Sequence, residues 1–213
     1  MLKAVVEPDM RFFERCVGLL VRHWLLWTNV FLGLYALVPW ISPLLQALGY
    51  KTIGRALFLA YRPFCHQRPE LSYHLFGYPV AFCHRDTAIY GTLLLAGLVF
   101  GLLRGHLRPL PGWVFLALAL PMALDGLTQL PRAFLQDWPL RTQNGWAVTL
   151  TLGRLPAWFY HGDAVGSLNW WLRTITGILF ALGLAWAVFP RIEQEVRQTR
   201  SYAERASKAT LSI

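Results

Sequence analysis

The chain has 213 residues, of which 55% are hydrophobic and only 15% are charged, and this composition excludes an ordinary soluble domain. Its ten tryptophans point to a membrane, because indole rings favour the membrane–water boundary. A net charge of +9 would suit nucleic acid, but the basic residues cluster at the ends of apolar segments. We therefore expect the partner to be a lipid bilayer and not a nucleic acid.

Four apolar segments predict an all-α polytopic membrane protein with four transmembrane helices, since about 20 apolar residues cross the hydrocarbon core. The expected spans cover about 24–45, 87–103, 109–130 and 170–190 of a single membrane domain, 1–213. The first outer loop, 46–86, begins with a segment that mixes basic and apolar residues, which predicts a helix lying in the membrane interface at 51–62.

Small residues recur at helical spacing in two of the spans. Gly97 and Gly101 form a G-x-x-x-G pattern that allows another helix to approach closely. We expect a packing surface here, with a membrane-protein partner as one candidate; the alternative is that glycine is simply common in such helices. Gly177, Ala181 and Ala185 repeat the spacing in the fourth span.

The second outer loop, 131–169, is long and rich in Trp, Pro and Gly. Residues Trp146 to Leu152 alternate after Asn144-Gly145, which predicts a hairpin with a strand. A loop of this length is usually functional or disordered, and its aromatic content favours an ordered loop packed on the bilayer or on a partner.

Charge distribution predicts the orientation. Four spans place both termini on one side, and that side would hold a basic N-terminal segment, the turn at 104–108 and the basic tail, 191–213. The positive-inside tendency then makes both termini cytoplasmic and the first outer loop extracytoplasmic.

This topology brings polar side chains from distant segments to the outer end of the bundle. Asp125 and Gln129 share one helical face of the third span, and Arg173 and Thr176 lie near the outer end of the fourth. We predict that Asp125 pairs with Arg173, because an ionisable residue inside a span is costly unless it is paired or faces water. The pair would either lock two helices or form the floor of a pocket. The expected pocket residues are Gln67, Arg85, Asp125, Gln129, Arg173 and Thr176.

The stretch 64–91 carries two of the three cysteines and three of the six histidines. Asp86 or Thr87 is placed to cap the second span, so the helix dipole and Arg85 would lower the pKa of Cys83. Three states are open: a Cys65–Cys83 disulfide, free thiols, or a site for zinc or another divalent metal. The candidate metal ligands are Cys65, His66, Cys83, His84 and Asp86, and His74, His161 and Asp163 lie on the same predicted side.

An ordered set of motifs resembles a family of small prokaryotic membrane proteins, domain of unknown function 2085. The motifs are Cys65-His66-Gln67, Pro69-Glu70 with Ser72, Cys83-x-Arg85, Asp125-Gly126 with Gln129, and Arg173 with Thr176-Gly177. The resemblance implies a prokaryotic plasma membrane, but it implies no activity. Asp86 stands where the family pattern has a cysteine, Ala88 where it has glycine and Leu71 where it has arginine. A carboxylate can still bind a metal, but it cannot do thiol redox chemistry.

Two functional hypotheses follow. In the first, the outer pocket binds a metal or small ligand and supports redox or hydrolytic chemistry on a lipid-soluble or periplasmic substrate. In the second, the chain is a non-catalytic accessory subunit that packs against a larger membrane complex through Gly97/Gly101 or the 131–169 loop. Transport fits less well, because four short spans without an internal repeat are not typical of transporters.

Overall fold

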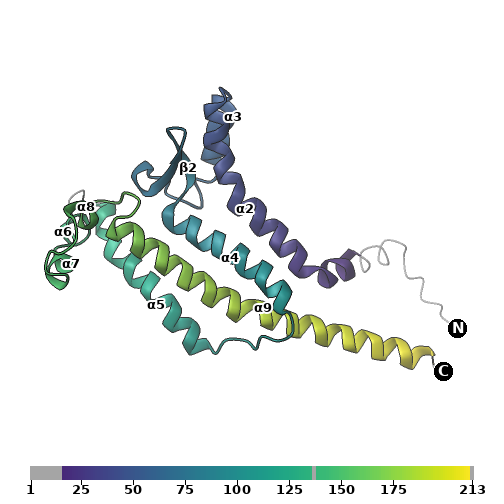
Figure 1. Cartoon of the computed structure of the whole chain (residues 1–213). Helices are drawn as coiled ribbons and strands as arrows, with labels where there is room; N and C mark the ends of the chain where they lie inside the picture. Colours follow the sequence, from purple (N-terminus) through teal and green to yellow (C-terminus); the bar gives the residue numbers. More distant parts are fainter. Residues whose placement is uncertain (1–15, 136–137, 212–213) are drawn as a thin grey trace.

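Four long helices dominate the structure, a computed structural model that describes residues 16–135 and 138–211 (Figure 1). They are α2 (Trp24–Ala47), α4 (His84–Leu103), α5 (Gly112–Gln129) and α9 (Leu168–Leu211). Each contains a segment long and apolar enough to cross a membrane. The predicted class, an all-α polytopic membrane protein, is therefore confirmed.

The core lies where α4 packs between α2 and α9. Trp24, Phe100 and Phe189 contribute one ring from each helix, and their ring centroids lie 5.7–6.1 Å apart. The small-residue pattern of α9 faces α4, since a Cβ on Gly177 would lie 3.2 Å from the Arg85 carbonyl oxygen and Ala181 is fully buried. Gly97 likewise faces Asn29 of α2. Gly97 therefore packs against α2 within the chain, and a partner protein at the exposed Gly101 stays a prediction.

The outer surfaces of the helices are apolar. In α5 the buried residue is Asp125, whereas Leu116, Leu120, Leu124 and Leu127 are all exposed. An exposed apolar row of this kind is what a lipid bilayer would cover.

The connection between α2 and α4 contains a helix and a hairpin. Helix α3 (Lys51–Ala60) forms where an interfacial helix was predicted, and it crosses close to α2 at Gly54, whose carbonyl accepts a hydrogen bond from Ser42 Oγ (2.9 Å). A short 3-10 helix, η1 (Pro69–Leu71), leads into strands β1 (Ser72–Leu75) and β2 (Tyr78–Cys83), which pair antiparallel. The two turn residues, Phe76 and Gly77, both have positive φ, as a tight two-residue turn requires.

The second outer loop is built from short helices. They are η2 (Leu130–Ala133), α6 (Pro139–Thr142), α7 (Gly145–Leu150) and α8 (Ala157–Tyr160). The predicted strand at 146–152 is wrong, because most of that segment is helix α7, which begins after Asn144 in the left-handed conformation (φ 48°). The prediction that this loop has an ordered conformation holds for its described residues. Figure 1 shows its helices beside the start of α9.

Candidate metal and ligand pocket

A cavity of about 350 Å³ lies at the end of the bundle where the hairpin and the second outer loop meet the helices. Its walls come from the segment before η1, the start of α4, the end of α5 with η2, and α9. The lining residues are Phe64, Cys65, His66, Arg68, Leu71, Cys83, Arg85, Asp86, Gly126, Gln129, Leu130, Arg132 and Arg173. The convergence expected from the topology is thus present, because residues more than 100 positions apart share one cavity.

One wall carries three metal-ligand atoms. The Sγ atoms of Cys65 and Cys83 and a carboxylate oxygen of Asp86 all lie within 4.8 Å of one another. Cys83 Sγ is 3.2 Å from Asp86 Oδ2, and the Cys83 amide donates to Cys65 Sγ at 3.2 Å. Both cysteines are buried and free, so the structure does not contain the disulfide that was the alternative.

The local geometry differs from the capping prediction. Helix α4 starts at His84 with Cys83 as its N-cap residue, so neither Asp86 nor Thr87 caps it. The pKa of the Cys83 thiol is raised, first by its hydrogen bond with Cys65 and then by burial, and these outweigh the lowering effect of His66. The predicted lowering of this pKa is therefore wrong. Binding of a metal would favour the thiolate, because a coordinating thiol is deprotonated.

The two histidines of the stretch lie in different environments. His66 lines the cavity, and its Nδ1 accepts a hydrogen bond from the Arg68 amide (3.4 Å). His84 lies outside the group of three ligand atoms; it is 1% exposed and its ring centroid lies 4.6 Å from that of Tyr73. The structure thus places His66 beside the cavity and His84 in the protein interior.

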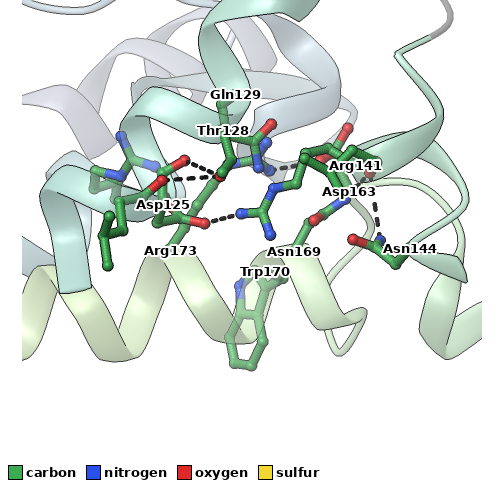
Figure 2. Close-up of polar contacts among 12 residues, drawn as sticks. Asp125, Thr128, Gln129, Arg141, Asn144, Asp163, Asn169, Trp170 and Arg173 are labelled. Carbon is green, nitrogen blue, oxygen red and sulfur yellow. Dashed lines mark hydrogen bonds and ion pairs between the residues drawn. The ribbon is translucent and has the colours of Figure 1, made fainter. Parts of the chain in front are cut away.

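Asp125 lies beneath the cavity and binds two arginines. One carboxylate oxygen accepts from Arg85 of α4 and the other from Arg141 of α6. The predicted partner, Arg173, instead pairs with Asp163. The predicted Asp125–Arg173 pair is therefore wrong, although both side chains belong to the one group of polar contacts in Figure 2.

Asp163, in the segment before α9, also lies between two arginines. Its oxygens accept from Arg132 of η2 (2.8 Å) and from Arg173 of α9 (2.7 Å). Burial raises the pKa of Asp163, but the hydrogen bonds and charges of the two arginines outweigh it, so the pKa is lowered overall. Burial, followed by the positive charges of Arg173 and Arg85, lowers the pKa of Arg141 to about 10, which leaves Arg141 protonated at neutral pH.

Two buried asparagines hold Arg141 in place. Asn144 Nδ2 donates to the Tyr160 carbonyl (2.6 Å), and Asn169 Nδ2 donates to the Arg141 carbonyl (2.6 Å), as Figure 2 shows in part. Both asparagines are 0% exposed. The outer loop is thereby fastened to the start of α9. The roles of Arg132 and Arg141 were not predicted from the sequence; the available signal was that charged residues occur in an aromatic-rich connection between two spans.

The remaining predicted pocket residues divide into two groups. Gln129 lines the cavity, and its buried Nε2 has no hydrogen-bond partner among the described residues. Gln67 lies outside the cavity lining, where its Nε2 donates to the carbonyls of Phe58 and Ala81. Thr176 is also outside the lining and is buried in α9.

Comparison with known proteins finds sequence similarity but no structural relative. The sequence model of the family described as "Predicted membrane protein (DUF2085)" matches residues 65–187. An uncharacterized protein, MJ1492, of Methanocaldococcus jannaschii is 29% identical over 104 residues, which cover 46% of this chain and 67% of that protein. No solved structure matches the chain. The family match spans every wall of the cavity except Phe64.

Proposed function

The chain belongs to the family described as predicted membrane protein (DUF2085), and from this premise we propose that its cavity binds a divalent metal ion through Cys65, Cys83 and Asp86. The observation that carries the proposal is the convergence of two sulfur atoms and one carboxylate oxygen, within 4.8 Å of one another, on the wall of a cavity. Cys83 and Asp86 lie three positions apart at the start of α4, and the fold brings Cys65 to them from the segment before η1.

The donor set favours zinc. Thiolate sulfur suits zinc better than magnesium or calcium, and a carboxylate oxygen is an accepted zinc ligand. Three protein ligands are the number found in catalytic zinc sites, where a fourth position is left for water or substrate. His66 lines the same cavity and could supply that fourth ligand. With the fourth position open, the site supports hydrolytic chemistry better than thiol redox chemistry.

Metal analysis of purified protein tests this proposal. We expect about one zinc ion per wild-type chain, and a large loss of metal in Cys83→Ala and Asp86→Asn variants. Cys16→Ala is the matched control, because it removes a cysteine that lies outside the ligand group. Equal and negligible metal in the wild type and in Cys83→Ala, after growth with added zinc, would refute the metal site.

We also propose that the cavity faces the extracytoplasmic side of a prokaryotic plasma membrane, with both termini in the cytoplasm. In Figure 1 the hairpin and α6–α8 lie at the opposite end of the bundle from the C-terminal end of α9. That C-terminal end and the turn around Arg104 carry basic residues, which favours the cytoplasm. A reporter that is active only in the cytoplasm, fused after Ile213, should be active; activity of a periplasm-specific reporter at that position would reverse the orientation.

An accessory role is the second candidate function. It is favoured by large apolar side chains that project from the second outer loop: Leu150 and Leu152 are each 75% exposed and Trp158 is 61% exposed. These residues suit either the bilayer surface or a partner protein. Native gel analysis after extraction in mild detergent separates the two, since a particle of monomer size would contradict the accessory role.

A further inference from the structure

The arginines beneath and beside the cavity outnumber their partners. Four arginines, Arg85, Arg132, Arg141 and Arg173, bind two aspartates, Asp125 and Asp163. Each of the four carboxylate oxygens already accepts from an arginine, so the network carries two more positive than negative charges. The four arginine side chains are only 4–23% exposed. Buried charge without a counter-ion is costly, so a surplus of this size calls for an anion.

The surplus is directed at the cavity. Arg85, Arg132 and Arg173 line it, and Arg68 lines it as well, without an ion pair among the described residues. Among these lining residues one side chain, that of Asp86, carries a carboxylate. Asp86 belongs to the metal-ligand group with Cys65 and Cys83. The arginines among the lining residues therefore outnumber the carboxylate, and the cavity is positively charged.

Two hydrogen-bond donors on side chains that line the cavity have no acceptor among the described residues. They are Nε of Arg85 and Nε2 of Gln129, and both atoms are buried. Gln129 Oε1 accepts from Arg132 Nη1 at 3.4 Å, which fixes the amide so that its NH2 group remains available. A buried donor without an acceptor costs free energy, and an oxyanion in the cavity could supply both donors with one.

From these contacts we propose that the cavity binds a phosphate group. A phosphate monoester carries about −1.5 to −2 charges at neutral pH, which matches the surplus of two, and it accepts hydrogen bonds in several directions. The donors come from four segments around the cavity, and this suits an oxyanion that accepts hydrogen bonds in several directions. The inference uses the same cavity as the proposed function, but it does not depend on a bound metal.

The phosphate could belong to a lipid headgroup or to a soluble molecule. Phe64 and Leu130 also line the cavity and are 63% and 57% exposed, so part of its rim is apolar and accessible. That rim would suit the first carbons of a lipid chain. The test therefore compares a phospholipid with inorganic phosphate.

Calorimetric titration of metal-free protein in an uncharged detergent tests the proposal. The ligands are inorganic phosphate, dihexanoyl phosphatidic acid and, as a control without phosphate, dihexanoyl glycerol. We expect saturable binding of at least one phosphate compound and none of dihexanoyl glycerol. Tighter binding of phosphatidic acid would assign the phosphate to a lipid, and tighter binding of inorganic phosphate to a soluble ligand. Binding of dihexanoyl glycerol as tight as that of phosphatidic acid, or saturable binding of neither phosphate compound, would overturn the proposal.

Two variants connect the binding to the named donors. Arg68→Gln and Gln129→Leu should each weaken phosphate binding about tenfold or more, the loss expected for one charge-assisted or buried hydrogen bond. Arg62→Gln is the matched control, because Arg62 is an exposed arginine on the same connection that does not line the cavity. Unchanged affinity in both cavity variants, with melting temperatures like the wild type, would refute the site.

The phosphate site and the metal site can fail separately. Arg68→Gln should keep the metal content of the wild type, since Arg68 is not among the three metal ligands. Wild-type protein that contains negligible zinc when purified after growth with added zinc, and that binds phosphate, would refute the metal proposal alone. Protein that carries metal but shows no phosphate binding would refute the phosphate site alone.

Discussion

Both ends of the helical bundle use a buried carboxylate held by two arginines, but the surroundings differ. At the end away from the cavity, Glu193 of α9 accepts from Arg104 and Arg197, both at 2.7 Å. Those arginine side chains are 32% and 55% exposed, whereas the arginines around Asp125 and Asp163 are 4–23% exposed. Water can solvate the surplus charge of Glu193's partners, but it has little access to the surplus at the cavity.

This comparison separates a structural role from a binding role. Glu193 also accepts from the indole of Trp24 (3.1 Å), so it joins α2, α4 and α9 and its hydrogen-bonding capacity is used within the chain. At the cavity, donors of Arg85 and Gln129 are left over. Burial of the arginines distinguishes the cavity end, since both ends pair a carboxylate with two arginines, and the Glu193 end also has a buried donor without an acceptor among the described residues, Arg104 Nη2.

Removing Asp125 should have the largest effect on stability. Asp125→Ala leaves Arg85 and Arg141 buried without their carboxylate, and breaking a buried pair in this way costs about 3–5 kcal/mol. Thermal melting in detergent measures the loss. Thr128→Ala on the same helix is the control, because its hydroxyl bonds only to backbone of its own helix and the change should cost under about 1 kcal/mol. Equal melting of wild type and Asp125→Ala would contradict the importance of this network.

Lowering the pH should destabilise the protein by protonating Asp163, and this loss of stability should be smaller than that caused by Asp125→Ala. Because the pKa of Asp163 is lowered by folding, ionised Asp163 stabilises the protein at pH values above the ordinary aspartate pKa of about 4. This stabilisation is lost as the pH falls through the pKa of the folded state. A protonated carboxyl keeps some hydrogen bonds to Arg132 and Arg173, which is why the effect is smaller. Melting curves between pH 7 and pH 3 measure it. Asp163→Asn should lack this component, and an identical acid response in both proteins would contradict the prediction.

The sequence predicted the architecture well because hydropathy and span length are local properties. Four apolar segments in series predict an up-and-down arrangement, and that arrangement places Cys65, Cys83, Asp125 and Arg173 at one end of the bundle. The shared cavity could therefore be predicted from topology without any knowledge of side-chain contacts.

The ion-pair partners could not be predicted, because they depend on how an irregular loop folds. Arg141 and Asp163 pair with Asp125 and Arg173 where the loop backbone also bonds to the buried amides of Asn144 and Asn169, and no periodic pattern encodes these contacts. The same limitation explains the strand predicted at 146–152, where alternation over a few residues fits a short helix equally well. The β1–β2 hairpin was missed because Phe76 is an uncommon residue at positive φ.

At the opposite end, neutralising Glu193 should have a smaller effect than either change at the cavity. Glu193→Gln keeps the shape of the side chain and its hydrogen bond from Trp24, while Arg104 and Arg197 lose a charged acceptor that water can partly replace. We expect a loss of about 1–2 kcal/mol by thermal melting. A loss as large as that of Asp125→Ala would show that exposure does not separate the two ends.

The smallest effect is expected for Arg197→Gln, which tests the exposed end of the same contact. Arg197 is four residues from Glu193 on α9, and its side chain is 55% exposed, so the pair belongs to the class of surface helix pairs that contribute about 0–1 kcal/mol. Raising the salt concentration should reduce even this difference, because exposed pairs are screened. Salt should have less influence on the Asp125→Ala difference, since Asp125 and Arg141 are 4% exposed. Melting of both variants at low and high salt measures the contrast, and equal salt dependence would mean that ions reach the cavity network as freely as they reach Arg197.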